Sequence, residues 1–138
     1  ENIIKELGFK LAFGQQSSHI SLRENKFRLP RFSFNEKFGE IERFKMIVES
    51  FPLEVFDISP SDTIVQNSRT NIGFSTNQPL HSINCYHSSD KSFEMKKLPP
   101  SRIEIHFKDE LDKGINRVNC TSYDKNEKLR WYGKILIN

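Results

Sequence analysis

The chain has 138 residues, enough for one hydrophobic core with an accessory piece but too few for a complete barrel enzyme. Its 21 basic and 18 acidic side chains are interspersed along the sequence, whereas nucleic-acid-binding proteins usually gather Lys and Arg on one face, so we expect no nucleic acid partner. A hydrophobic fraction of 36% predicts a folded chain, and no apolar run reaches the roughly 18 to 20 residues of a membrane span.

The first predicted elements are a helix and a short strand. Apolar residues recur at helical spacing over the first seven positions, and Gly8 follows where a helix end favours glycine. Residues 9–13 then alternate as a strand, and residues 14–18 form a polar loop after it. This succession is typical of an α/β barrel repeat, in which loops at that strand end carry the working groups. Because Glu1 already lies in the middle of such a helix-to-strand unit, we expect the chain to be cut from a longer one.

A domain boundary is predicted near residue 58. Residues 21–35 show no periodicity, and we interpret them as a loop that crosses the barrel rim. Residues 40–51 place apolar side chains on one helical face and charged ones opposite, which predicts an amphipathic surface helix. Residues 57–62 have the composition of a linker. The predicted domains are therefore residues 1–58, the end of a barrel, and residues 59–138.

Beyond the boundary the apolar period changes to two, which predicts six short strands. Their apolar positions are Ile72 with Phe74, Ile83 with Cys85, Phe93 with Met95, Ile103 with Ile105 and Phe107, Val118 with Cys120, and Leu129, Trp131, Gly133, Ile135 and Ile137. Turn-rich stretches separate them at spacings that suit antiparallel pairing. The expected fold class is α+β, with a terminal βα piece of a barrel followed by an antiparallel β-sandwich-like domain of about six strands.

The two cysteines, Cys85 and Cys120, lie in two of these predicted strands. Their separation fits neither a CxxC redox pair nor the clustered ligands of a zinc site. Two alternatives stay open: a pair of buried thiols, or a cross-strand disulfide in an exported protein. The Cα separation that decides between them is not a property of the sequence.

Several sequence motifs carry a resemblance to a known family. The first three are GFKLAFGQQS at 8–17, RLPRF at 28–32 and NEKFGEIERF at 35–44. In this order and spacing they resemble the closing section of bacterial polysaccharide deacetylases of the NodB-homology type, which are carbohydrate esterases. The later motifs are similar to the β-rich C-terminal extension of one subgroup. These are FPLEV at 51–55, IGF at 72–74, NCY at 84–86, RVNCT at 117–121 and WYG at 131–133.

The resemblance implies that the whole protein folds as a distorted β/α barrel. It also implies that the whole protein is a hydrolase that removes N-acetyl groups from a polysaccharide. The family holds a divalent, zinc-like metal with an Asp and two His and uses an Asp base and a His acid. Neither a paired-Asp strand nor a His-x-x-x-His segment occurs here, so no catalytic residue or metal ligand is carried over. We expect this fragment to be inactive and to bind no cofactor, because the metal and the polysaccharide would bind the full-length enzyme. Its location is either the cytoplasm or the cell envelope of a bacterium.

Four polar residues are candidates for the wall of the substrate groove. Gln15, Gln16 and Ser17 follow the presumed barrel strand and would hydrogen-bond sugar hydroxyls, or else form an ordinary polar loop. Arg31 lies in the rim loop. Its planar guanidinium suits a ligand carboxylate, and the alternative is an ion pair that anchors the loop.

Three histidines invite a ligand or proton-transfer interpretation because imidazole titrates near neutral pH. His19 lies alone in a polar loop, and His81 and His87 flank one predicted strand without a third ligand. We expect His19 to have no such role, and we expect His81 and His87 to be solvent-facing strand residues.

The aromatic residues of the C-terminal half suggest a platform on which a sugar ring stacks. Its members would be Trp131 and Tyr132 with Tyr86 and Tyr123. The alternation argues against Trp131, because it shares a predicted face with Leu129 and other apolar residues and is expected in the core.

The leading hypothesis is the non-catalytic end of a deacetylase, and it predicts exposed apolar side chains where barrel partners are missing. These side chains are Ile3, Leu7, Phe9, Leu11 and Phe13. The alternative is a stand-alone β-sandwich module that binds carbohydrate or another partner, which predicts a self-contained core and an aromatic row on an outer sheet face. A third hypothesis is a structural domain that mediates oligomer or envelope contacts.

Overall fold

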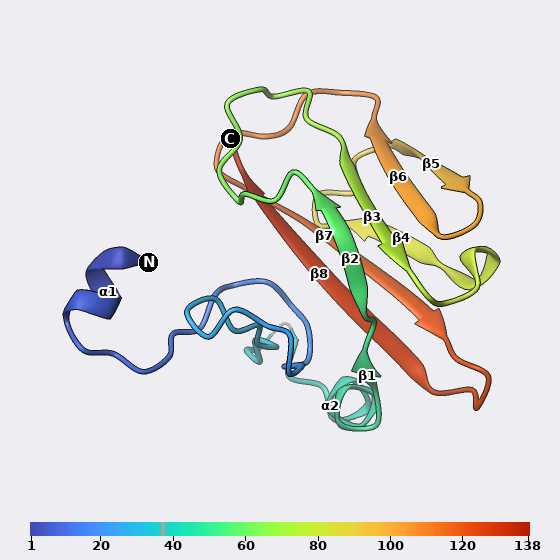
Figure 1. Ribbon diagram of the computed structural model, residues 1–138. Helices are drawn as coiled ribbons and strands as arrows, with labels where there is room; N and C mark the ends of the chain where they lie inside the picture. Colours follow the sequence, from blue (N-terminus) through green and yellow to red (C-terminus); the bar gives the residue numbers. More distant parts are fainter. Residues whose placement is uncertain (37) are drawn as a thin grey trace.

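The computed structural model describes residues 1–36 and 38–138, and β-strands dominate it (Figure 1). The strands form two four-stranded sheets. One has the order β1-β8-β7-β4, with bounds Phe51–Pro52, Leu129–Ile137, Ile115–Tyr123 and Asn84–His87. The other has the order β2-β3-β6-β5, with bounds Val55–Ser59, Ile72–Thr76, Arg102–Phe107 and Phe93–Leu98. Neighbouring strands are antiparallel except β1 and β8, which run parallel.

Helices contribute little to the fold. They are α1 (Asn2–Glu6), α2 (Ile41–Val48) and the short 3-10 helix η1 (Leu80–Ser82). Both predicted α-helices are present, each shorter than predicted. Gly8 follows α1 with a φ of 80°, the left-handed conformation that favours glycine at a helix end. Within the described residues, no helix has the length and apolar character needed to cross a membrane.

The strand predicted at residues 9–13 is absent, so that prediction is wrong. Phe13 forms an isolated parallel bridge with Leu29, and Ala12 exchanges two backbone hydrogen bonds with residues of the same loop. A strand requires a partner strand that satisfies its backbone groups over several residues. Among the described residues, the hydrogen-bond partners of this stretch lie in a short loop, and no barrel sheet surrounds it.

Residues 1–34, called the N-terminal segment below, lie beside the sandwich in largely irregular conformation (Figure 1). Helix α1 lies away from both sheets in this view. It is tied to a loop of the same segment, because Arg28 Nε lies 2.6 Å from Glu1 Oε1 and the Asn25 amide donates to the same carboxylate. The segment reaches the sandwich farther along, at its contacts with β8.

All six predicted strands are present, as β3 to β8. Strands β1 and β2 add one strand to each sheet, and both begin before the predicted boundary at residues 58 and 59. The structure thus places residues 51–58 in the sandwich or at its edge, and the boundary falls inside β2.

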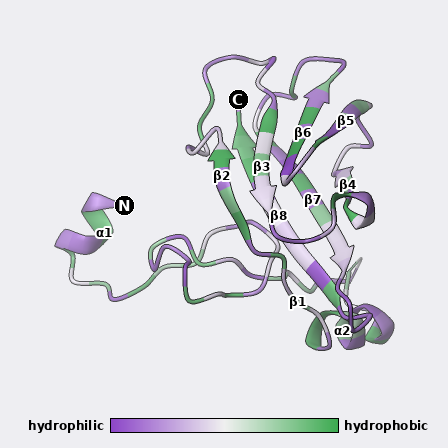
Figure 2. Cartoon of the chain, turned by 45° about the vertical axis from the view of Figure 1, so that its right-hand side comes forward, coloured by the Kyte–Doolittle hydropathy of each residue, from purple (hydrophilic) through white to green (hydrophobic). Residues whose placement is uncertain are grey.

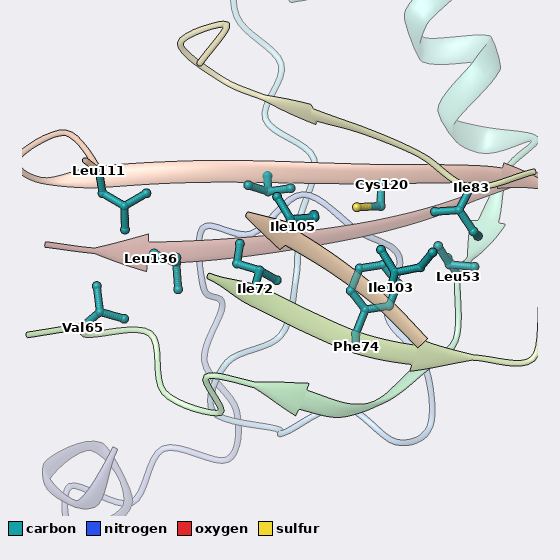
Figure 3. Close-up of a cluster of buried hydrophobic side chains, with 11 residues drawn as sticks. Leu53, Val65, Ile72, Phe74, Ile83, Ile103, Ile105, Leu111, Cys120 and Leu136 are labelled. Carbon is teal, nitrogen blue, oxygen red and sulfur yellow. The ribbon is translucent and has the colours of Figure 1, made fainter. Parts of the chain in front are cut away.

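The core lies between the two sheets (Figure 3). Phe74 and Ile103 from one sheet and Cys120 and Leu136 from the other are each no more than 1% exposed. The full cluster is Leu53, Val65, Ile72, Phe74, Ile83, Ile103, Ile105, Leu111, Val118, Cys120 and Leu136. Burying a side chain of this size contributes roughly 1.5 to 3 kcal/mol, so this cluster is the main source of stability.

Strand β8 faces the opposite way from the prediction. Tyr132 and Leu136 point into the core, whereas Trp131 lies on the other side and packs edge-on against Phe32 with 5.4 Å between ring centroids. Placing Trp131 in the core was therefore wrong. The reason is that the N-terminal segment covers part of the outer side of β8, so the more apolar set of alternate positions faces outward, while the set on the core side includes Arg130 and Lys134.

A disulfide joins Cys85 of β4 to Cys120 of β7. The two residues are directly paired across the strands, with a Cα separation of 4.0 Å. The two cysteines thus form a cross-strand disulfide in the structure and are not free thiols, and the bond lies beside the core within one sheet.

Candidate functional site

The outer face of the β1-β8-β7-β4 sheet, the side away from the core, contains the candidate sites. Its side chains alternate with those of the core along each strand. They are Asn84 and Tyr86 of β4, Arg117, Asn119, Thr121 and Tyr123 of β7, and Leu129, Trp131, Gly133 and Ile135 of β8. The N-terminal segment covers one part of this face, and an open pocket lies on another.

Three of the predicted groove residues belong to the part of the N-terminal segment that covers this face. Gln16 donates a hydrogen bond to the backbone carbonyl of Arg28, and Gln15 accepts one from the Arg117 guanidinium at 3.3 Å. The Ser17 backbone lies so close to Gly133 that a Cβ there would approach the Ser17 carbonyl oxygen to 2.3 Å. The structure thus brings these three residues together as a lid on β8.

The fourth predicted groove residue, Arg31, contacts this cluster through its backbone. Its backbone amide donates to the Gln16 carbonyl at 3.0 Å, while its side chain is exposed. Among the described residues no carboxylate lies within ion-pair distance of its guanidinium. Its role in binding a substrate stays a prediction.

A small hollow of about 160 Å³ separates the lid from β8, and Lys134 forms part of its wall. The Lys134 ammonium is buried and donates to the carbonyls of Pro60, Ser61 and Asp62 at 2.8, 3.3 and 3.2 Å. Burial lowers the pKa of Lys134 to about 8, while the Asp62 carboxylate opposes this change. Because all three N–H donors have partners, Lys134 fastens the loop after β2 and is not available to a ligand.

His19 connects the lid to the end of α2. Its Nε2 lies 2.7 Å from the Ser50 hydroxyl oxygen, and this hydroxyl donates to the Ile47 carbonyl at 2.9 Å. The imidazole therefore donates to Ser50, and burial lowers the pKa of His19. A serine that already donates its proton to a backbone carbonyl is a structural contact. The pair does not resemble an activated nucleophile.

The other two candidate histidines have different environments. His81 is exposed, as predicted, but it lies in η1 and not in a strand, and its carbonyl accepts a hydrogen bond from Lys97. His87 is only 5% exposed, so its prediction as a solvent-facing residue is wrong. It points between the sheets and packs edge-on against Phe107, with ring centroids 5.5 Å apart, and burial lowers the pKa of His87.

The described residues do not fit the metal centre that the deacetylase resemblance implies for the whole enzyme. They contain no group of three or more His, Cys, Asp or Glu placed to hold an ion. His106, the remaining histidine, pairs with Glu104 at 3.0 Å on β6. No chemical step through a metal is therefore assigned to this part of the chain.

A second, open pocket of about 310 Å³ lies on the uncovered part of the outer face. Tyr86, Tyr123 and Trp131, from three adjacent strands, contribute to its wall. Tyr132 does not, because it packs against Phe74 in the core, and burial raises the pKa of its phenol. The full lining is Met46, Ser82, Asn84, Tyr86, Thr121, Ser122, Tyr123, Leu129 and Trp131.

Strand register determines the order of side chains in this pocket. Asn84, Thr121 and Trp131 form one row across β4, β7 and β8. Tyr86 lies one row to one side, and Tyr123 lies one row to the other. The arrangement presents aromatic rings and neutral polar groups on one sheet surface.

Comparison of the chain with protein-family models, with curated proteins and with solved structures found no match. The deacetylase resemblance therefore rests on the sequence motifs alone. The function of the chain has to be argued from its exposed surfaces.

Proposed function

We propose that this chain is the non-catalytic C-terminal part of a metal-dependent polysaccharide deacetylase, in which the N-terminal segment completes the wall of the barrel and the sandwich packs beside it. The motifs at 8–17, 28–32 and 35–44 support the family. The row of exposed apolar side chains at the start of the chain is the single observation that carries the proposal.

Five large apolar side chains within eleven residues face solvent. They are Ile3, Leu7, Phe9, Leu11 and Phe13, with exposed fractions of 72, 69, 59, 48 and 56%. Figure 2 shows hydrophobic residues along this part of the chain, at a distance from the two sheets. Scattered apolar residues on a surface are ordinary, but a continuous set of this size indicates a surface that packs against something.

The sandwich does not need the same partner. Its own two sheets bury Phe74, Ile72 and Ile103 to 1% exposure or less. Burial of a side chain of this size contributes roughly 1.5 to 3 kcal/mol, so covering the five exposed ones would stabilise an assembly considerably. A barrel preceding the N-terminal segment would supply that covering surface.

The disulfide supports a particular compartment. A disulfide persists in oxidising environments and is rare in the cytosol. The Cys85–Cys120 bond therefore favours the cell envelope over the cytoplasm within the proposed function.

The first test is the reading frame upstream of Glu1. Roughly 150 to 250 preceding residues would complete a barrel enzyme. We expect them to encode a paired-Asp strand and a His-x-x-x-His segment. The longer protein should then release acetate from an N-acetylated oligosaccharide and lose this activity in a metal chelator. An upstream frame without those motifs, or a longer protein that releases no acetate, would contradict the proposal.

A second test addresses docking itself. The double substitution Leu11→Glu with Phe13→Glu should lower the melting temperature of the longer protein, because two charges would enter a buried interface. In the 138-residue chain the same substitutions should leave the unfolding midpoint unchanged, since both side chains are already exposed. Leu98→Glu, at an exposed leucine on β5, is the matched control and should have little effect in either protein.

A further inference from the structure

The open pocket on the outer face has no charged residue in its lining. Its nine lining residues include no Asp, Glu, Lys, Arg or His, although 28% of the whole chain is charged. Phosphates, carboxylates and nucleic acids are bound through Lys and Arg. The lining is therefore complementary to an uncharged ligand.

The exposed groups of the pocket are aromatic faces beside neutral hydrogen-bonding groups. Tyr86 and Tyr123 are 58% and 62% exposed, although tyrosine rings of a folded domain are usually at least partly buried. Asn84 and Thr121 lie in the row between them. Within the described residues, the side chains of these four residues make no hydrogen bond to the protein, so their polar groups are available to a ligand.

Trp131 is held in place by its surroundings. Its indole Nε1 donates to Asn119 at 3.3 Å, and Phe32 packs against it edge-on. The indole ring therefore forms a fixed wall of the pocket. A wall that is already ordered loses little conformational entropy when a ligand binds.

We propose that this pocket binds one ring of a neutral glycan. The pyranose lies over the row of Asn84 and Thr121, which hydrogen-bond its hydroxyls, and its two faces stack on the rings of Tyr86 and Tyr123, one from each side. The volume of about 310 Å³ lies at the lower end of the range for small-molecule sites, which fits a single sugar ring. The lining of this site includes none of Gln15, Gln16, Ser17 and Arg31, and the proposal does not depend on the deacetylase function.

The test uses the fluorescence of the chain, because Trp131 is its only tryptophan and lies in the pocket wall. Two neutral probes, cellotetraose and tetra-N-acetylchitotetraose, are titrated into the 138-residue chain. We expect a saturable change in emission with at least one of them. Tyr86→Ala and Tyr123→Ala should each weaken that binding about tenfold, the upper range for one aromatic contact. Tyr86→Phe should bind nearly as well as the parent chain, because it keeps the stacking surface.

The control is Phe9→Ala, which removes an aromatic ring of the same exposure, 59%, outside the pocket. It should leave the affinity unchanged, and the unfolding midpoint of each variant verifies that the chain is folded. The proposal is overturned if neither probe gives saturable binding up to about 10 mM, a concentration at which even weak sites fill. It is also overturned if Phe9→Ala weakens binding as much as Tyr86→Ala, or if a sulfated oligosaccharide binds more tightly than both neutral probes. Acetate release by the longer protein is a separate measurement, so failure of either proposal leaves the other intact.

Discussion

The N-terminal segment and the sandwich place the same kinds of side chain in opposite environments. Phe74 in the sandwich is 0% exposed, whereas Phe13 in the segment is 56% exposed. In the sandwich, period-two apolar residues from two sheets meet and exclude water. In residues 1–13 of the segment, by contrast, Ile3, Leu7, Phe9, Leu11 and Phe13 face solvent. Apolar residues stabilise a fold only where a second layer faces them, so the apolar residues of the sandwich contribute to its stability, whereas the exposed ones at the start of the segment do not.

Residues 14–32 of the segment contact the sandwich along the outer side of β8 and at Arg117 of β7. Ser18 donates to the Trp131 carbonyl at 2.9 Å, the Ser17 backbone lies against Gly133, and Phe32 packs on Trp131. These contacts cover part of the outer face of β8 and leave α1 outside. The segment is therefore positioned by the sandwich but adds little to its core.

The comparison is tested most strongly by truncating one phenylalanine in each region. Phe74→Ala should lower the free energy of unfolding by about 3 to 5 kcal/mol, because it leaves a cavity between the sheets. Phe13→Ala should change it by no more than about 0.5 kcal/mol, as is usual for exposed positions. Urea unfolding followed by circular dichroism measures both. If Phe13→Ala destabilised the chain as much as Phe74→Ala, the segment would belong to the folding unit of the sandwich.

Removing the disulfide should have the next largest effect. The bond joins residues 35 positions apart, and replacing Cys85 and Cys120 with Ser should cost about 2 to 4 kcal/mol of stability through the freed loop. Reducing agent should destabilise the parent chain by a similar amount and leave the double variant unchanged. Amide hydrogen exchange should show reduced protection in the strands of the sandwich, while the exchange rates of α1 stay the same. Equal loss in both regions would argue against their independence.

The sequence predicted much of the sandwich because its strands alternate between core and solvent. It missed β1, which has two residues, and β2, whose regular pattern is interrupted where Asp57 adopts a φ of 50°. The strand expected at residues 9–13 has the correct alternation but no partner. An alternation of apolar and polar residues indicates that the two sides of a segment differ in polarity. It does not indicate whether another strand lies beside the segment.

The candidate sites show the same limit. Tyr86 and Tyr123 were proposed as platform residues from composition, and the structure places both around one pocket. The alternation predicts the wrong face for Trp131 because the more apolar side of β8 is covered by the N-terminal segment, while its core side includes Arg130 and Lys134. The disulfide between Cys85 and Cys120 depends on a strand pairing that no local pattern encodes. Contacts distant in sequence, such as Gln15 with Arg117, had no signal at all.

A smaller perturbation targets the contact between the two regions. Gly133→Ala would place a Cβ within 2.3 Å of the Ser17 carbonyl oxygen, so residues 14–18 must move away from β8. We expect a cost of about 1 to 3 kcal/mol, as for other overpacked contacts. Hydrogen exchange should rise at residues 14–18 while protection of the core strands is retained. Glu94→Ala, at an exposed position of the other sheet, is the control. Loss of protection throughout the sandwich would mean that the lid is part of its core.

The smallest expected effect is a difference in pH dependence between two histidines, one from each region. Burial lowers the pKa of both His19 and His87. A lowered pKa in the folded state means that the unfolded chain binds more protons as the pH falls below about 6.5, so stability present above this pH is lost below it. Because His87 lies between the sheets, its protonation should weaken the whole sandwich, while protonation of His19 should loosen only the contact with Ser50.

The measurement is the urea midpoint between about pH 7.5 and pH 5.5, above the range in which carboxylates titrate. Asp112, Lys91 and Asp90 are the charged groups that act on His87, and the His87→Gln variant retains all three, so the difference in slope between variant and parent reports the imidazole. His87→Gln should flatten the dependence, and His19→Gln should leave it nearly unchanged. The reverse result would mean that the contact of the N-terminal segment with α2 governs global unfolding, and the division between a self-sufficient sandwich and a dependent segment would then fail.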